Sequence, residues 1–572
     1  MAEGNHKRGR VVSYAQGEEF FLRRGQKHMQ SGDYRNALVS YHKLLEMSPD
    51  TLRYLMDTAW LFGQLGYYEV SNRYLMRLLN LEGCEKDAVL HALGCNYYAL
   101  CEYICAEECL RLALVNSTDP EIREDAGALL SSLEGYQSDP EQPGFPPEYE
   151  NLHNCYCAHI ANDRCRKFPQ LLALALSSGG DPYCAPLQYA VLLYFTGDWK
   201  NGLGFLEMML ESDPENYRAM AVYAVLLHRR GNRLGKAEPW LGKLKSIRSD
   251  FDDEVFCAAA ALYEYGRYAE AAALLEGMDC TQVDGRLADQ LLALSYYCDG
   301  QYTKAKCVWE DMARMMPWDG TARYYARLAA EAEAGKPRRK KLDMLADVPE
   351  NEAAARMKLL SDLMNGDGER LREHWRQDAV REAVYWLAGQ RNQSLAYAGC
   401  KILLEIRGKE DFGYVTDRIL DRHRTELFRK QLAELLSARG YSKRIIFIGF
   451  GGLAAIWVPR LDSDQLAALS KSQRQAYAIA VQALYTRLEK DVTGELEALW
   501  VRMCRREKLV PKTMVRPEVW ALGLEYAFLS SVAEIMDSPE SMAARYDLNP
   551  KAARRVCDII IRDGVLRENA AD

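Results

Sequence analysis

The sequence lacks a hydrophobic run long enough to cross a membrane, which takes about 18 residues. The best candidate, 445–458 (IIFIGFGGLAAIWV), is too short and has glycines at its centre. The basic residues near the N-terminus are not followed by the apolar core of a signal peptide. We therefore expect no membrane association and a cytoplasmic location, in which the 16 scattered cysteines are reduced thiols.

An excess of positive charge is also missing. The 81 Asp and Glu residues outnumber the 73 Lys and Arg residues, and the formal net charge is −8. Such a chain as a whole repels nucleic acid, so any DNA contact must come from a local basic patch. The basic run 336–341 (KPRRKK) is more typical of a solvated linker than of a nucleic-acid contact.

Catalytic and cofactor motifs are absent, since the sequence contains no HExxH, no GxSxG and no Walker loop. One segment gathers possible zinc ligands, which are His153, Cys155, Cys157, His159 and Cys165. A Cys-x-Cys pair in a helix points its thiols to different faces, however, and no Cys-x-x-Cys pair occurs. A repeat helix whose small apolar positions are Cys is the favoured explanation of the segment. We expect no enzymatic activity, no cofactor and no metal.

What the sequence does contain is a repeat marked by glycines. Within each of two groups the glycines are 34 or 35 residues apart, and they are Gly32, Gly66, Gly197, Gly231, Gly266 and Gly300. Small residues stand seven positions before each turn, and these are Gly25, Ala59, Gly94, Ala190, Ala224, Ala259 and Ala293. Two antiparallel helices of about a dozen residues and two short turns add up to roughly 34 residues. Glycine suits the turn because a positive φ costs it little, and small residues suit the helix crossing.

These residues resemble the tetratricopeptide repeat (TPR) family over roughly 18–120 and 149–317. The sequence departs from the family pattern at Cys101, which replaces a turn glycine, and in the degenerate unit 149–182. The resemblance implies an all-α solenoid of helical hairpins in two arrays. It also implies a concave face, lined by the first helix of each hairpin, that binds proteins or peptides.

The twelfth position of each first helix faces this groove according to the resemblance. The residues there are Tyr98, Tyr194, His228, Tyr263 and Tyr297. They either grip a peptide, since a tyrosine offers a flat apolar face with a polar tip, or pack between neighbouring units. Repeats that clamp the acidic C-termini of chaperones carry Lys, Arg and Asn at set positions, but this sequence has Leu22, Gln26, Ala88 and Ala92 there. The chaperone carboxylate clamp is therefore absent.

The expected order of the chain begins with a disordered or extended segment 1–17. After it come a first TPR array with a capping helix (18–135), a Pro-rich linker (136–148), a second TPR array with a capping helix (149–335), a helical domain (336–442), a β-hairpin turning at 449–452 (443–461) and a C-terminal helical module (462–572). A phosphate-binding loop at 443–461 is disfavoured, because the segment lacks a full GxGxxG motif or a following Lys-Ser/Thr.

The C-terminal module contains two predicted short helices. Ser538-Pro539 and Asn549-Pro550 both fit an N-cap followed by a proline at the first helical position. The segment 538–563 resembles the helix-turn-helix family, with Asp547 at the corner. In that resemblance the residues that would contact DNA are Lys551, Arg554, Arg555 and Arg562.

The sequence thus favours a non-enzymatic TPR scaffold that binds a protein or peptide of unknown identity through its concave faces. The alternative is a transcriptional regulator whose repeats sense a peptide or partner and whose C-terminal helices contact DNA.

Overall fold

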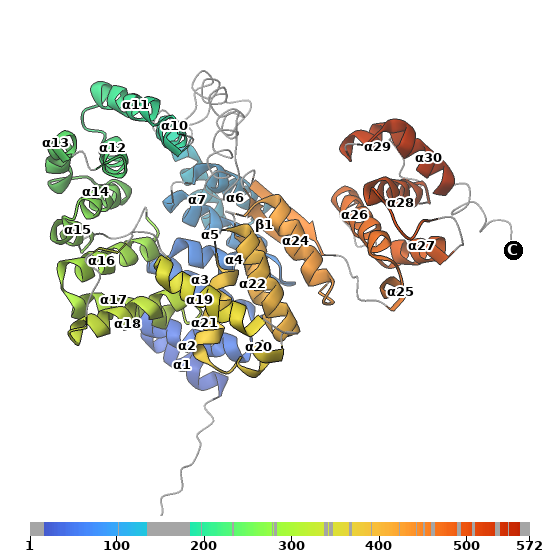
Figure 1. Cartoon of the computed structure of the whole chain (residues 1–572), viewed down its shortest axis with the longest axis horizontal. Helices are drawn as coiled ribbons and strands as arrows, with labels where there is room; N and C mark the ends of the chain where they lie inside the picture. Colours follow the sequence, from blue (N-terminus) through green and yellow to red (C-terminus); the bar gives the residue numbers. More distant parts are fainter. Residues whose placement is uncertain are drawn as a thin grey trace, which may run out of the picture. The chain divides into compact units, whose positions relative to one another are not determined.

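The computed structural model describes residues 17–133 and 184–560, apart from short gaps of at most six residues. The predictions for the N-terminal segment before residue 17, for the Pro-rich linker and for the degenerate unit 149–182, with its cluster of cysteines and histidines, lie outside the described residues. The described chain is almost entirely helical and forms consecutive helical hairpins, as Figure 1 shows. The all-α, TPR-like solenoid is therefore confirmed.

The first array consists of three helical hairpins followed by a capping helix. Its helices are α1 (Glu18–Gln30), α2 (Tyr34–Met47), α3 (Leu52–Gln64), α4 (Tyr68–Leu79), α5 (Lys86–Ala99), α6 (Tyr103–Asn116) and α7 (Pro120–Leu133). Among the described residues, the second array has four hairpins and its own capping helix. These helices are α10 (Cys184–Phe195), α11 (Trp199–Ser212), α12 (Tyr217–Arg229), α13 (Leu234–Lys245), α14 (Asp252–Glu264), α15 (Tyr268–Leu275), α16 (Gly285–Asp299), α17 (Tyr302–Met315) and α18 (Gly320–Glu333).

The repeat-defining residues have the backbone conformation and the burial expected of their residue types. All six turn glycines have positive φ, between 73° and 123°. All seven small residues are buried in the helix crossings. At Gly25 the reason is steric, because a Cβ atom there would come within 2.9 Å of the Tyr41 ring of the paired helix. A larger residue would push these two helices apart.

The helical domain and the hairpin follow the second array. Their elements are α19 (Glu350–Met364), α20 (Glu369–Glu373), α21 (Asp378–Ala388), α22 (Gln393–Ile406), η2 (Gly408–Asp411), α23 (Phe412–Leu420), α24 (Glu426–Ser437), β1 (Arg444–Gly449) and β2 (Gly452–Trp457). The strands are antiparallel and Gly449 is opposite Gly452, so the predicted short β-hairpin is confirmed.

Four buried arginines hold this helical domain together, and they are Arg356, Arg418, Arg424 and Arg429. Arg429 of α24 donates to the carbonyl oxygens of Ile419, at 2.9 Å, and Asp421, at 2.8 Å. Its guanidinium also lies 4.3 Å from the ring centroid of Phe447 in β1. One charged side chain thus joins the end of α23 to the hairpin.

The C-terminal module packs six helices around one apolar core. They are α25 (Asp464–Ala467), α26 (Lys471–Leu488), α27 (Thr493–Arg505), α28 (Pro517–Ser531), α29 (Pro539–Arg545) and α30 (Pro550–Ile560). The predicted caps are present, since Ser538 accepts from the Ser541 amide and Asn549 accepts from the Lys551 amide. Helices α28 and α30 approach closely, because a Cβ atom at Gly523 would lie 2.6 Å from Ile560.

Contacts divide the chain into two compact units. Unit 1 contains Met1–Glu102, Leu112–Ala126 and Met209–Val348, and unit 2 contains the remaining residues. Most of the first array therefore shares a unit with α12 to α18 of the second.

Candidate functional site

The predicted groove residues fall into two groups. Tyr98, Tyr194 and His228 are partly exposed, whereas Tyr263 and Tyr297 are fully buried. The His228 ring packs edge-on against Tyr265, at 4.8 Å between centroids. Only the first group is open to a ligand from solution. Tyr263 is covered by a later segment of the same chain.

After α18 the chain returns to contact α14, which carries the predicted groove residue Tyr263. The hydroxyl of Tyr263 in α14 donates to the Leu342 carbonyl oxygen at 2.6 Å, and the Leu342 side chain is buried. Lys341 donates to the main-chain oxygen of Glu264 at 2.9 Å and to its carboxylate at 3.0 Å. Burial raises the pKa of Tyr263 far above its usual range, so the hydroxyl remains a donor.

A second tyrosine makes the same kind of contact further along. Tyr325 of α18 donates to the Asp347 carbonyl oxygen at 2.6 Å, and Val348 is buried next to it. The described residues Lys341, Leu342, Asp347 and Val348, which we call the groove segment, thus contact the first helix of one hairpin and then the capping helix. Outside regular secondary structure, they lie where the resemblance expects a peptide ligand.

Within unit 1 the two arrays meet at the turn between α3 and α4. The Gly285 amide at the start of α16 donates to the Gly66 carbonyl oxygen at 2.7 Å. Tyr67 donates to Asp289 at 2.5 Å, and Asp284 accepts from the Glu69 amide at 3.3 Å. We call these residues the inter-array contact. In Figure 1 the helices α16 to α18 of the second array lie beside the first array.

His42 extends the inter-array contact towards α17. Its Nε2 atom lies 2.6 Å from the Met315 carbonyl oxygen, and its ring meets Trp318 edge-on at 5.5 Å. Burial lowers the pKa of His42, so the imidazole is neutral and carries its proton on the nitrogen that donates to Met315. Arg35 adds ion pairs with Asp289, at 3.5 Å, and Asp311, at 3.4 Å.

Asp284 makes the inter-array contact pH-dependent. Burial, and then the charge of Glu69, raise the pKa of Asp284 to about 6. The folded state therefore holds this proton more tightly than the unfolded state, where the pKa is about 3.9. Its stabilising contribution is complete below about pH 4 and is lost as the pH rises to about 6, a change of roughly 3 kcal/mol.

Asp284→Asn should therefore be more stable than the wild type at pH 7, by about 1–3 kcal/mol, and close to it at pH 4. Asparagine stays neutral, and its single oxygen can still accept from the Arg286 amide, whereas the longer hydrogen bond from the Glu69 amide is lost. Urea unfolding of both proteins at both pH values measures the difference in stability. His42 titrates in the opposite sense, but it does so in both proteins, so its contribution cancels from the difference. An equal difference at pH 4 and pH 7 would contradict the raised pKa.

An exposed aromatic pair on the first array was not predicted from the sequence. Trp60 of α3 is 44% exposed and packs edge-on against Tyr34 of α2, at 5.4 Å between centroids. Half-exposed tryptophans are frequent anchors of protein interfaces. The sequence could have indicated this exposure, because Trp60 comes directly after the small residue Ala59. Ala59 faces the helix crossing, and its position fixes which face of the helix Trp60 is on.

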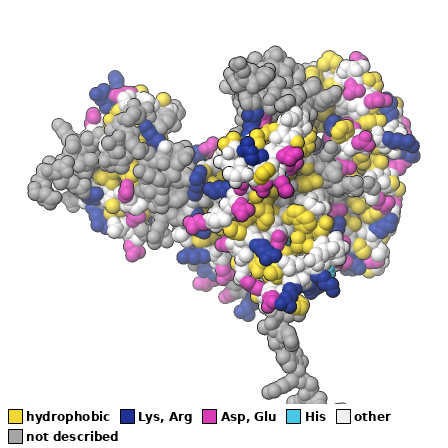
Figure 2. All heavy atoms as spheres, turned by 180° about the vertical axis from the view of Figure 1, so that it is seen from behind, with side chains coloured by type: hydrophobic (Ala, Val, Ile, Leu, Met, Phe, Trp, Pro, Cys, Tyr) yellow, Lys and Arg dark blue, Asp and Glu magenta, His cyan; other side chains and the backbone are white. Residues whose placement is uncertain are grey.

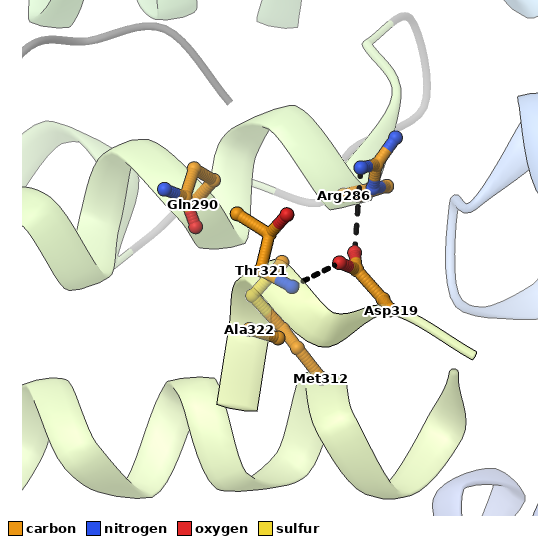
Figure 3. A pocket seen from close by; sticks show the side chains of 6 residues that line it. All are labelled: Arg286, Gln290, Met312, Asp319, Thr321 and Ala322. Carbon is orange, nitrogen blue, oxygen red and sulfur yellow. Dashed lines mark hydrogen bonds and ion pairs between the residues drawn. The ribbon is translucent and has the colours of Figure 1, made fainter. Parts of the chain in front are cut away.

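A small hollow of about 10 Å³ lies between α16, α17 and the start of α18. Figure 3 shows Arg286 paired with Asp319, whose carboxylate also accepts from the Thr321 amide at 2.9 Å. Pockets for small molecules are usually about 300–1,000 Å³ in volume, so this hollow is too small for a typical substrate.

The C-terminal basic residues are on the solvent side of α30. Lys551, Arg554 and Arg555 are exposed, while Val556 and Ile560 point into the core. Arg554 pairs with Glu540 of α29 at 3.0 Å, which offsets part of the positive charge. Arg562 and the corner residue Asp547 lie outside the described residues. The predicted helices are present, but DNA contact remains a prediction.

Charge of both signs is mixed on the surface. On the face drawn in Figure 2, Lys and Arg side chains alternate with Asp and Glu side chains. Among the described residues, no helix is both long enough and apolar enough to span a membrane.

Comparison with known proteins assigns no family to this chain. No protein-family model matches the sequence, and no curated protein matches it. A similarity to a chain in the solved structure of Naa15/Naa10 bound to HypK-THB covers 96% of this chain and 66% of that chain, with 13% identity and a TM-score of 0.22. The chain thus spans just under two thirds of that chain. At this TM-score the similarity carries no argument about function.

Proposed function

We propose that this chain is a non-enzymatic scaffold that binds an extended segment of a partner protein in the groove of its second array. The observation that carries the proposal is the hydrogen bond from Tyr263 to the Leu342 carbonyl oxygen. A residue at the register position of the family's peptide groove is bonded to the main chain of a non-helical segment. The groove segment therefore occupies the position that we propose for the partner's peptide.

The contacts of the groove segment indicate what a partner peptide needs. Tyr263 and Tyr325 bond main-chain carbonyl oxygens, which every sequence offers. Selectivity would come from the buried Leu342 and from the ion pair between Lys341 and Glu264. The expected ligand is thus an extended peptide with a basic residue directly before a large aliphatic residue.

A tethered segment competes with free ligands because its effective concentration is about millimolar. The experiment therefore uses a fluorescent peptide with the sequence of residues 336–350 and the full-length chain carrying Leu342→Glu. The substitution places a charge in an apolar site and expels the groove segment. We expect the peptide to bind this variant at least about 10-fold more tightly than the wild type.

The matched control is Leu427→Glu, which changes a leucine of α24 that is 68% exposed. This variant should bind the peptide as weakly as the wild type, and a scrambled peptide should bind neither protein. If the Leu342→Glu chain is folded by circular dichroism and does not bind the peptide, the proposal is wrong.

Tyr263→Phe should loosen the groove segment without unfolding the array. Loss of one hydrogen bond costs about 0.5–1.5 kcal/mol, so trypsin should cleave after Lys341 about 3–10-fold faster. Tyr296→Phe is the control, since the Tyr296 hydroxyl bonds Glu276 instead. Equal cleavage rates in the two variants would contradict the contact.

DNA binding is the second candidate function. The observation in its favour is that Lys551, Arg554 and Arg555 are exposed on one helix whose opposite face is buried. Fluorescence anisotropy of the full chain with random duplex DNA tests it across a salt series. Binding that weakens steeply with salt and falls in the Arg554→Ala/Arg555→Ala variant would support it. No binding at low salt would remove this candidate.

A further inference from the structure

Three side chains with metal-binding atoms lie together near the end of the first array. His91 and Cys95 are on α5, and Asp125 is on α7. The His91 Nε2 atom lies 2.7 Å from Asp125 Oδ2 and 3.6 Å from Cys95 Sγ. All three donor atoms lie within 4.8 Å of one another, and in the described part of the chain no other three His, Cys, Asp or Glu residues do so.

The helices explain why these atoms converge. His91 and Cys95 are four residues apart, so α5 presents both on the same face, one turn apart. The capping helix α7 brings Asp125 to that face. The His91 side chain is 20% exposed and the Asp125 side chain is 57% exposed, so an ion can reach the two inner donors from solvent past the exposed carboxylate.

The types of donor atom indicate which metal ion this cluster would bind. An imidazole nitrogen, a thiolate sulfur and a carboxylate oxygen are the ligands that Zn²⁺ uses, whereas Ca²⁺ and Mg²⁺ take oxygen ligands and not thiolates. With bonds of about 2.0–2.3 Å, tetrahedral zinc keeps its donor atoms about 3.3–3.6 Å apart. The Cys95–His91 distance already fits. The Asp125 carboxylate must move outward by less than about 1 Å, which an exposed side chain can do.

We propose that His91, Cys95 and Asp125 bind one Zn²⁺ ion, with the fourth position left to water. On binding, the Cys95 thiol gives its proton to solvent and coordinates as the thiolate. The ion would join α5 to α7 and so fix the helix that ends the first array. This site is separate from the groove segment, and its test is independent of the proposed function.

The test uses the metal-free full-length protein and Co²⁺, which replaces zinc and reports a thiolate ligand by a charge-transfer band in the near ultraviolet. We expect one equivalent of Co²⁺ to produce the band and Zn²⁺ to remove it by displacement. Cys95→Ser should abolish the band. Asp125→Asn, on the exposed side, should weaken Zn²⁺ binding in calorimetry at least about 10-fold while the fold is kept.

Two control variants separate this site from other thiols. Cys257→Ser removes a half-buried cysteine of α14, and Cys155→Ser/Cys157→Ser removes the thiols of the other cysteine- and histidine-rich segment. Both should keep the band. The proposal is overturned if the band survives in Cys95→Ser, or if the folded wild type gives no band with excess Co²⁺. Loss of the band only in Cys155→Ser/Cys157→Ser would place the metal at that other segment and equally overturn it.

Discussion

Gly285→Val should destabilise unit 1 by about 3 kcal/mol, because it forces side-chain atoms into the inter-array contact. A Cβ atom at Gly285 would lie 2.8 Å from the Leu65 carbonyl oxygen and 3.1 Å from the Tyr67 ring. The first of these neighbours is backbone and cannot rotate away. Relief requires α16 to move off the first array, which breaks the hydrogen bond to Gly66.

Hydrogen exchange measured on peptides covering 65–70 and 284–290 reports this separation. Exchange there should accelerate about 100-fold, which corresponds to 3 kcal/mol at 1.4 kcal/mol per factor of ten. Gly285→Ala should have a smaller effect of the same sign. The control is Gly242→Ala in α13, where nothing lies within 4 Å of the added Cβ. That change should stabilise by about 0.5–1 kcal/mol. A stabilising effect of Gly285→Ala would contradict the close approach.

Arg429→Met should destabilise unit 2 by about 3 kcal/mol. The arginine is 2% exposed, and methionine fills a similar volume but removes the side-chain donor to the Ile419 carbonyl oxygen and leaves the Asp421 carbonyl oxygen with only the Arg424 amide. Each buried polar group left unpaired costs about 1–3 kcal/mol. Hydrogen exchange across 412–421 and 445–449 should accelerate, because both segments meet this side chain.

Lys430→Met is the matched control for Arg429→Met. It is the next residue of α24, about half exposed, and it pairs with Glu426 at 2.7 Å. An exposed ion pair of this kind contributes about 0.3–0.5 kcal/mol, so exchange should hardly change. Arg429→Lys should behave like Arg429→Met, since an ammonium cannot bond two carbonyl oxygens and cover the Phe447 ring at once. Equal effects of the changes at Arg429 and Lys430 would show that the buried guanidinium contributes nothing specific.

The local architecture could be predicted because its causes are local. A turn glycine and a small residue seven positions earlier fix one hairpin, and the pattern recurs often enough to be recognised in one sequence. Gly449 and Gly452 set the register of the strand pair for the same reason. Ser538 and Asn549 place the starts of α29 and α30 through caps that depend on a few neighbouring residues.

The candidate site was harder to predict because its contacts join distant parts of the chain. Asp284 and Gly285 look like an ordinary helix start, and nothing near them in the sequence points to Gly66. Tyr263 was predicted as a groove residue, but its partner Leu342 lies beyond the array in a segment without periodicity. His91 and Cys95 are adjacent on one helix face, whereas Asp125, which makes them a cluster, comes from α7. Only the fold brings these residues together.

The inter-array contact also has a consequence for biosynthesis. His42 and the Met315 carbonyl oxygen it meets are 273 residues apart in the chain. At roughly 5–20 residues per second, the ribosome needs about 15–50 s to make the intervening chain. During that interval the first array can form its hairpins, but the side chains that later meet α16 to α18 have no cover. A neighbouring copy on the same messenger could supply α16 to α18 instead, so crowded synthesis would favour domain-swapped dimers.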